Sequence, residues 1–142
     1  EPGVYKILKD FSNRWPQLPM TISESGLATD TGARRSEHIA RSLEQIARAR
    51  DEGVDIRGYY HWSLIDNFEW ALGWKPRFGL YSVNAGEGEY TRTKTEGAQT
   101  FQDIIAIRRL TDEMLETLGG TGPMSPVAES ANEVNEMCMP AE

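Results

Sequence analysis

The sequence predicts an α/β fold in which short strands alternate with helices. Three observations predict it: a strong helical pattern over residues 34–52, short apolar runs before and after it, and Gly or Pro between the segments. Alternation of this kind is typical of a parallel sheet covered by helices. Two strand–helix units cannot close a sheet. The residues therefore leave open a small α/β domain or the last quarter of a (β/α)8 barrel, which needs roughly 250 residues.

The first elements are a helix and a short strand. Residues 2–15 carry apolar side chains three or four positions apart, which predicts a helix. Pro2 suits its first turn, and Pro16 ends it. Residues 20–23 predict a strand, and the polar stretch 26–32 predicts a turn-rich loop.

The second unit begins with the clearest helix in the chain. Residues 34–52 place an apolar stripe on one face and charged residues on the other, and Gly53 stops the pattern. Residues 54–63 predict a second strand, because β-branched and aromatic types dominate there. A third extended run follows at 78–83, and residues 94–118 are predicted to be mostly helical.

Composition narrows the classes of function. The 142 residues carry a net charge of −7 and no basic cluster, which disfavours nucleic-acid binding. No run approaches the roughly 20 apolar residues that span a bilayer, so no membrane association is expected. Residues 119–142 contain four Glu and no Lys or Arg, and we expect a disordered acidic tail there. A single cysteine favours a reducing, cytoplasmic location, and the N-terminus predicts a chain that starts partway through a larger protein.

Two segments carry candidate chemistry. Glu24 ends the first predicted strand, where barrel enzymes place functional residues, although an exposed loop glutamate is the plainer interpretation. Trp62, Glu69 and Trp70 follow the second strand, and indole rings beside a carboxylate suit a sugar. An amphipathic helix over residues 62–69, with its aromatic side chains in the core, is the alternative.

Cofactors are not predicted. His38 and His61 are the two histidines, and neither has a second His or Cys at ligand spacing, so no metal site is expected. We expect both to serve in packing. No glycine-rich phosphate-binding loop precedes a helix, so the sequence contains no motif that predicts a nucleotide cofactor.

Two motifs in the chain are specific. Residues 23–26 read Ser-Glu-Ser-Gly, and residues 62–70 read Trp-Ser-Leu-Ile-Asp-Asn-Phe-Glu-Trp. With these motifs, residues 2–105 resemble glycoside hydrolase family 1, the β-glucosidase family, which has Thr-Glu-Asn-Gly at the end of its seventh strand. The second motif is one conservative change from the motif after that family's eighth strand. The resemblance implies that the chain is the C-terminal part of a (β/α)8 barrel, with about its last two βα units in residues 1–118.

The resemblance also implies roles for five residues. Glu24 is expected to be the nucleophile, and Trp62 the platform under the sugar. Glu69 is expected to bridge sugar hydroxyls, which favours unphosphorylated β-glucosides or related substrates, and Trp70 to donate its indole N–H. Phe78 is expected in the pocket wall. The family also has a cis peptide bond after the tryptophan at position 62, and Ser25 departs from its usual Asn.

Half of the catalytic machinery is not in the sequence. A retaining glycosidase uses two carboxyl groups, and the family's Asn-Glu-Pro segment, which supplies the acid/base, does not occur here. We therefore expect the chain to need the rest of the barrel as a partner and to be inactive alone. The alternative is a non-catalytic sugar-binding or interaction module of the same fold.

Overall fold

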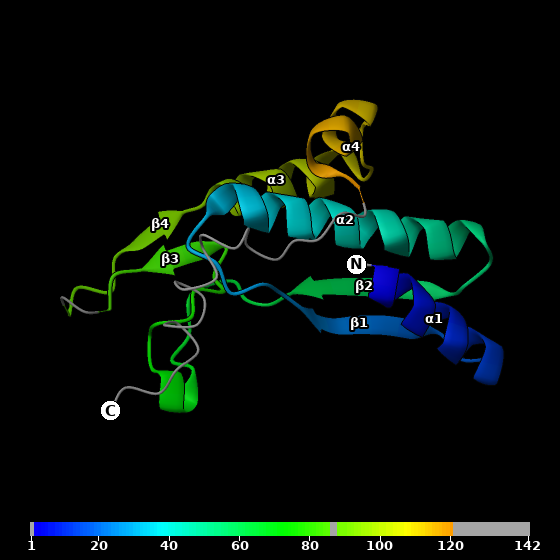
Figure 1. Ribbon diagram of the computed structural model, residues 1–142, viewed down its shortest axis with the longest axis horizontal. Coiled ribbons are helices and arrows are strands. Elements are labelled where there is room, and N and C mark those ends of the chain that lie inside the picture. The colour runs from blue at the N-terminus through cyan, green and yellow to red at the C-terminus, as the bar shows by residue number, and fades with distance from the viewer. Residues whose placement is uncertain (1, 86–87, 121–142) are drawn as a thin grey trace, which may run out of the picture.

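The computed structural model describes residues 2–85 and 88–120 (Figure 1). The sequence predicted an acidic tail over residues 119–142. Its residues from 121 onward lie outside the described range. The elements follow in the order α1 (Pro2–Arg14), β1 (Met20–Ser25), α2 (Gly32–Asp51), β2 (Ile56–His61), the 3-10 turn η1 (Trp70–Leu72), β3 (Tyr81–Val83), β4 (Arg92–Lys94), α3 (Glu96–Ile107) and α4 (Asp112–Leu118).

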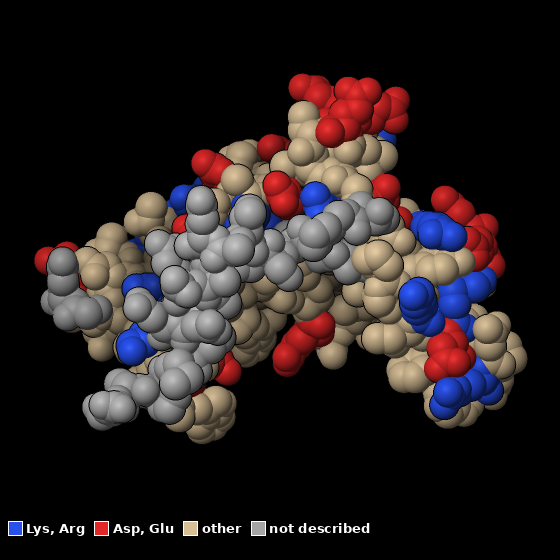
Figure 2. All heavy atoms as spheres, in the orientation of Figure 1, with Lys and Arg blue, Asp and Glu red and all other residues tan. Residues whose placement is uncertain are grey.

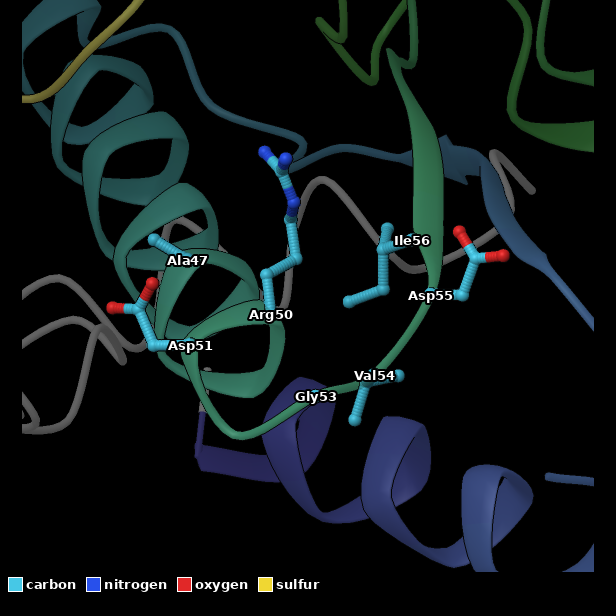
Figure 3. A pocket seen from close by; sticks show the side chains of 7 residues that line it. All are labelled: Ala47, Arg50, Asp51, Gly53, Val54, Asp55 and Ile56. Carbon is cyan, nitrogen blue, oxygen red and sulfur yellow. The ribbon is translucent and has the colours of Figure 1, made fainter.

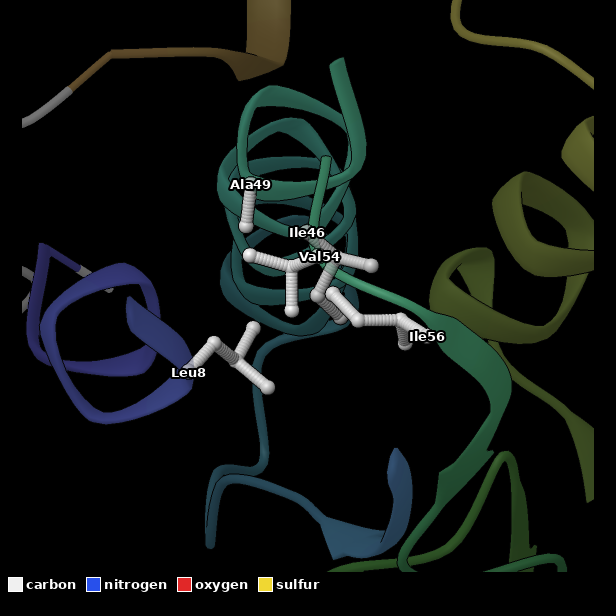
Figure 4. Packing of buried hydrophobic residues seen from close by; sticks show 5 residues of the cluster. All are labelled: Leu8, Ile46, Ala49, Val54 and Ile56. Carbon is white, nitrogen blue, oxygen red and sulfur yellow. The ribbon is translucent and has the colours of Figure 1, made fainter. Parts of the chain in front are cut away.

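The centre of the fold is the parallel pair β1–β2, which lies beneath α2 in Figure 1. One face of this pair is covered by α1 and α2. Side chains from both helices and from the start of β2 form its core, which is shown in Figure 4: Leu8, Ile46, Ala49, Val54 and Ile56. The other face, which includes Thr21, Ser23 and Tyr60, is exposed among the described residues. This asymmetry decides which strand side chains are open to a ligand.

A second core joins α2 to α3. Ile39 of α2 packs with Leu80, Ala98 and Ile104, and all four are buried. The N-terminus of α3 is capped by Thr95, whose Oγ1 accepts a hydrogen bond from the Ala98 N–H at 3.2 Å. The packing fixes the direction in which the chain leaves the sheet and returns to α2.

The strands β3 and β4 form a small antiparallel hairpin beside the main pair, with Val83 opposite Arg92. It is connected to the loop after β2 by a parallel bridge between Ile65 and Tyr81. The hairpin therefore supports that loop, which has only the short turn η1 as regular structure of its own.

Residues 94–118 are mostly helical, as predicted, but they form two helices, α3 and α4, because Arg108 adopts the left-handed conformation (φ 56°) and Thr111 caps a new start. The alternative that the sequence left open for the tryptophan-rich segment is wrong. Residues 62–69 are not an amphipathic helix. They form a loop, so their aromatic side chains are not core residues of a helix.

The charged surface shows no single sign over the face in Figure 2. Acidic side chains gather on α4, whereas charges of both signs are mixed over α1 and the end of α2. Glu52 lies between two of these bases, 3.1 Å from Lys9 and 3.4 Å from Arg48. Within the described residues, no helix combines the length and apolar character that crossing a membrane requires.

Candidate active site

A β-bulge near the end of β1 turns Glu24 toward the open face of the sheet. Ile22 pairs with Tyr59 and Ser25 pairs with His61, so three steps along β1 match two along β2. In a regular strand, Glu24 would share the helix-covered face with Ile22. The extra residue leaves Ser23 and Glu24 both exposed and returns Ser25 to the helix side. The bulge is therefore what presents the carboxylate.

Trp62 is tied to the turn that follows Glu24. Its N–H donates to the Ser25 carbonyl at 2.9 Å, and its carbonyl lies so close to Gly26 that a Cβ on Gly26 would come within 1.9 Å of the oxygen. The peptide bond between Trp62 and Ser63 is cis, as the resemblance implied. The indole is 39% exposed. The structure thus brings Glu24 and Trp62 to the same edge of the sheet.

Glu69 and Trp70 lie at the far end of the loop after β2. The Asn67 amide donates to a Glu69 carboxylate oxygen, and the Glu69 N–H donates to the Gly73 carbonyl at 2.7 Å. Trp70 has φ 46° and is 86% exposed, so its indole makes little contact with the described residues. The site is therefore an open surface. Glu69 is half-buried and held by hydrogen bonds, whereas the side chain of its neighbour Trp70 is exposed.

Phe78 lies between η1 and β3, on the segment of chain that pairs with the residue after Trp62. Its carbonyl accepts a hydrogen bond from the Ser63 N–H at 3.1 Å, directly after the cis peptide. Nearby, the Trp74 ring makes edge contacts with Phe68 and Tyr90, with ring centroids 5.9 and 6.3 Å apart. An aromatic rim thus borders the loop on the side of the hairpin.

The helix side of the site carries the two histidines. His38 Nε2 lies 3.3 Å from the Ser25 hydroxyl, so α2 contacts the residue after Glu24. The His61 ring packs against Phe101 at 6.1 Å and against His38 at 6.3 Å. Burial lowers the pKa of His61 to about 4, and the nearby His38 and Arg35 charges act in the same direction. His61 is therefore neutral near pH 7 and packs behind the site, as its sequence position suggested.

Sequence reasoning did not find the buried charges under the loop. Asp66 and Arg35 are 3% and 2% exposed, respectively, and Arg77 forms an ion pair with Asp66 at 3.0 Å. In the sequence, Asp66 stood out only as one member of the motif at residues 62–70. Its partners come from residues 77–83, so no local signal in the sequence could have found them.

Cavities elsewhere in the fold do not include the predicted site residues. A cavity of about 430 Å³ lies at the opposite end of β2, where Gly53 and Val54 lead into the strand (Figure 3). Its charged lining residues, Arg50, Asp51 and Asp55, are far along the strand from Trp62. In residues 2–85 and 88–120, no three His, Cys, Asp or Glu side chains are grouped so as to hold a metal ion.

The arrangement of strands and helices is that of a mixed α/β segment. Helices cover one face of two parallel strands, and polar and aromatic residues gather at the carboxyl ends of those strands, as in barrel enzymes. A profile of the family described as "Glycosyl hydrolase family 1" matches residues 1–110. The chain belongs to that family.

Similar proteins are glycosidases of greater length. A "Beta-galactosidase" from Saccharolobus solfataricus is 36% identical over 126 residues, which are 88% of this chain and 25% of that protein. A "Bifunctional beta-D-glucosidase/beta-D-fucosidase" from Bifidobacterium breve is 36% identical over 118 residues, covering 73% of this chain and 25% of that protein. The solved β-glycosidase from Pyrococcus horikoshii superposes with a TM-score of 0.77 at 35% identity, over 84% of this chain and 27% of that one. The chain thus spans about a quarter of the length of these relatives.

Proposed function

We propose that the chain is the C-terminal part of a (β/α)8-barrel retaining β-glycosidase in which Glu24 is the nucleophile. The observation that carries this proposal is the register shift in β1, which leaves Glu24 exposed at the edge of the sheet where the Trp62 backbone is bonded to Ser25. A nucleophile must reach the anomeric carbon of a bound sugar. An exposed carboxylate at a strand end has the access that this reaction requires.

The other predicted residues suit sugar binding. The exposed face of Trp62 can stack on the C–H face of a pyranose, and Phe78 borders it. Glu69 keeps one carboxylate oxygen engaged with Asn67, which leaves the other for a sugar hydroxyl. The carboxylate at position 69 would repel a phosphate, so the substrate class is an unphosphorylated β-glucoside or a related sugar. Trp70 would donate its indole N–H to a neighbouring hydroxyl.

The second carboxyl group is proposed to come from the rest of the barrel. Retaining glycosidases need two carboxyl groups about 5–5.5 Å apart, one to attack and one to protonate the leaving group. The relatives are about four times as long as the matched segment, and this chain lacks the family's Asn-Glu-Pro segment. The partner of this chain is therefore the preceding part of such a barrel, on the same polypeptide or on another.

A covalent label tests the role of Glu24. The chain is combined with the N-terminal three quarters of the Saccharolobus solfataricus relative, which supplies the remaining strands. The assembly is treated with a 2-deoxy-2-fluoro-β-glucoside that carries a dinitrophenolate leaving group. A Glu24 oxygen bonds to the anomeric carbon, and the C–O bond to the leaving group breaks with its electron pair. The anion needs no acid, and the fluorine slows hydrolysis of the adduct.

Mass spectrometry should find one glycosyl ester, on the peptide that contains Glu24. Glu24→Gln should remove it, whereas Glu113→Gln, an exposed carboxylate on α4, should not. An adduct on another residue, or none in a well-folded assembly, would overturn the proposal.

A non-catalytic sugar-binding module is the second candidate. It is favoured by the same sequence observation, because the sugar-contacting residues are present while the acid/base segment is not. A module of this kind would bind a β-glucoside without forming the covalent adduct, so the labelling experiment separates the two functions.

A further inference from the structure

The Asp66 side chain is the most deeply held group in the loop after β2. Its carboxylate accepts hydrogen bonds from the Gly79 N–H at 2.9 Å, the Val83 N–H at 3.0 Å and Arg77 Nη1 at 3.0 Å. The residue is 3% exposed, so water does not replace these partners. A carboxylate removed from water needs such donors. All three come from residues 77–83, which lie outside the loop itself.

Arg77 extends this arrangement to the other half of the site. Its guanidinium also donates to the Val83 carbonyl at 2.8 Å. Its own carbonyl accepts from the Thr29 N–H at 2.9 Å and from Arg35 Nη2 at 2.8 Å. Thr29 follows Glu24 along the chain, and Asp66 follows Trp62. Residue 77 therefore connects the segment that carries the proposed nucleophile to the segment that carries the proposed sugar platform.

The buried arginine on α2 is fixed as closely as the carboxylate. Arg35 Nη2 donates to the Thr29 carbonyl at 2.7 Å, and Gly97 of α3 packs so closely on the Arg35 stem that a Cβ there would lie 2.6 Å from Cγ. The Arg35 stem is therefore packed tightly between α2 and α3. The network of Arg35, Asp66 and Arg77 thus lies against two helices on one side and holds a loop on the other.

The backbone alone does not hold the whole loop. The loop is connected to residues 78–81 by backbone hydrogen bonds up to Asp66, where the Asp66 N–H donates to the Tyr81 carbonyl at 3.1 Å. Beyond Asp66, the Glu69 N–H donates to the Gly73 carbonyl, four residues further along the chain, and the Phe68 ring contacts Trp74. Among the hydrogen bonds of the described residues, those of the Asp66 side chain are therefore the last that join the loop to residues 77–83 before Glu69 and Trp70.

We propose that Asp66 is the positioning residue of the loop 62–70, holding Glu69 and Trp70 in place through Gly79, Val83 and Arg77. The importance of this for sugar binding rests on the proposed function; the attachment of the loop does not. An amide at position 66 has one acceptor oxygen and an NH2 group that faces donors. Asp66→Asn therefore breaks part of the attachment without changing side-chain volume.

The four tryptophans make the test specific. Indole N–H signals in a 15N NMR spectrum report Trp62, Trp70 and Trp74 in or beside the loop, and Trp15 between α1 and β1 as an internal reference. In Asp66→Asn we expect the Trp70 and Trp74 signals to shift or broaden. The Trp62 signal, whose residue is held by the Ser25 carbonyl, and the Trp15 signal should stay in place. Asp55→Asn is the matched control, because it removes an exposed carboxylate 2.9 Å from Arg57. It should leave all four signals unchanged.

Arg77→Lys is the second variant. It keeps the positive charge but loses the planar guanidinium, whose Nη1 donates to both Asp66 and the Val83 carbonyl. We expect the Trp70 and Trp74 signals to move by smaller amounts. Wild-type positions of the loop signals in Asp66→Asn would overturn the inference. So would a collapse of all four signals together, since Asp66 would then support the whole fold and not the loop in particular.

A sugar titration separates this inference from the proposed function. With methyl β-glucoside as the probe and the assembled barrel as the protein, Asp66→Asn should weaken binding at least tenfold, and Asp55→Asn should not. If the wild-type assembly does not bind the glucoside while its loop signals still respond to Asp66→Asn, the proposed function fails and the positioning role stands. Unweakened binding with displaced loop signals would overturn the functional part of the inference.

Discussion

The Trp62 N–H donates to the Ser25 carbonyl at 2.9 Å, so the residue after Glu24 and the first residue of the tryptophan-rich loop share a backbone hydrogen bond. Since the bond runs between main chains, it does not depend on side-chain rotamers. Glu24 and Trp62 therefore keep a constant spacing as long as the strands stay paired.

Gly26→Ala should disrupt the junction. A Cβ at this position would lie 1.9 Å from the Trp62 carbonyl oxygen, so one of the two backbones must move. We expect a loss of more than about 2 kcal/mol in the free energy of unfolding, measured by urea denaturation. Gly3→Ala is the control, because no heavy atom lies within 4 Å of its Cβ. It should leave stability unchanged or raise it by less than about 1 kcal/mol.

Trp62→Ala should weaken sugar binding without unfolding the protein. The 39% exposed ring contributes little to the core but offers a flat apolar face. In the assembled barrel, we expect roughly tenfold weaker binding of a β-glucoside, which is about 1.4 kcal/mol, by isothermal titration calorimetry. Trp15→Ala, at the other end of β1, should bind as the wild type does. Equal losses in both variants would show that general destabilisation is the cause.

The stability of the fold should fall between pH 6.5 and pH 4 because of His61. Its pKa is about 4 in the folded chain and 6.5 in the unfolded chain, so the unfolded chain takes up a proton first. Stability is therefore complete above the unfolded pKa and decreases as the pH falls through this window. We expect a loss on the order of 1–2 kcal/mol after solvent screening, measured by urea denaturation at pH 7 and pH 4.5. His61→Phe should flatten this dependence; an unchanged slope would assign it to other groups.

Leu8 and Ile7 are neighbours on α1 with opposite environments. Leu8 is buried against Ile46 and Val54, whereas Ile7 is exposed among the described residues. Leu8→Ala should cost about 2–5 kcal/mol in the free energy of unfolding, and Ile7→Ala less than about 0.5 kcal/mol. Thermal denaturation of the two variants compares them directly. A large loss in Ile7→Ala would mean that a partner covers this face in solution.

The chain alone should show no turnover of p-nitrophenyl β-glucoside. One carboxylate can attack, but the second group that a retaining mechanism needs is proposed to lie elsewhere in the barrel. The measurement compares the wild type with Glu24→Gln, and both should match the uncatalysed rate. Activity that appears in the wild type and disappears in Glu24→Gln would place an acid/base within these 142 residues.

Local patterns in the sequence predicted most of the elements. The apolar stripe of α2, the proline after α1 and the β-branched runs each depend on neighbours within a few residues, so their types and approximate bounds could be predicted. The break between α3 and α4 was missed because Arg108 adopts a left-handed conformation without a glycine to signal it. The Thr-Asp-Glu start of α4 at residues 111–113 was the signal that could have shown it.

The geometry of the candidate site was harder to predict from the sequence. Alternation along β1 would have turned Glu24 toward the helices, and only the pairing with β2 reveals the extra residue. The burial of Asp66 depends on hydrogen bonds to residues 77–83. Bonds between segments so far apart in the chain produce no periodic pattern in the sequence. The roles of Glu24, Trp62, Glu69, Trp70 and Phe78 remain predictions that the experiments above test.

The backbone of Trp70 adopts a conformation that is unusual for a residue with a large side chain. A bulky residue at φ 46° is held in a region that glycine occupies freely, and its ring is 86% exposed. The strain is on the order of 1–2 kcal/mol, and burial among the described residues does not offset it. Folding of the described residues alone would favour glycine at this position, which agrees with the binding role that we propose for Trp70.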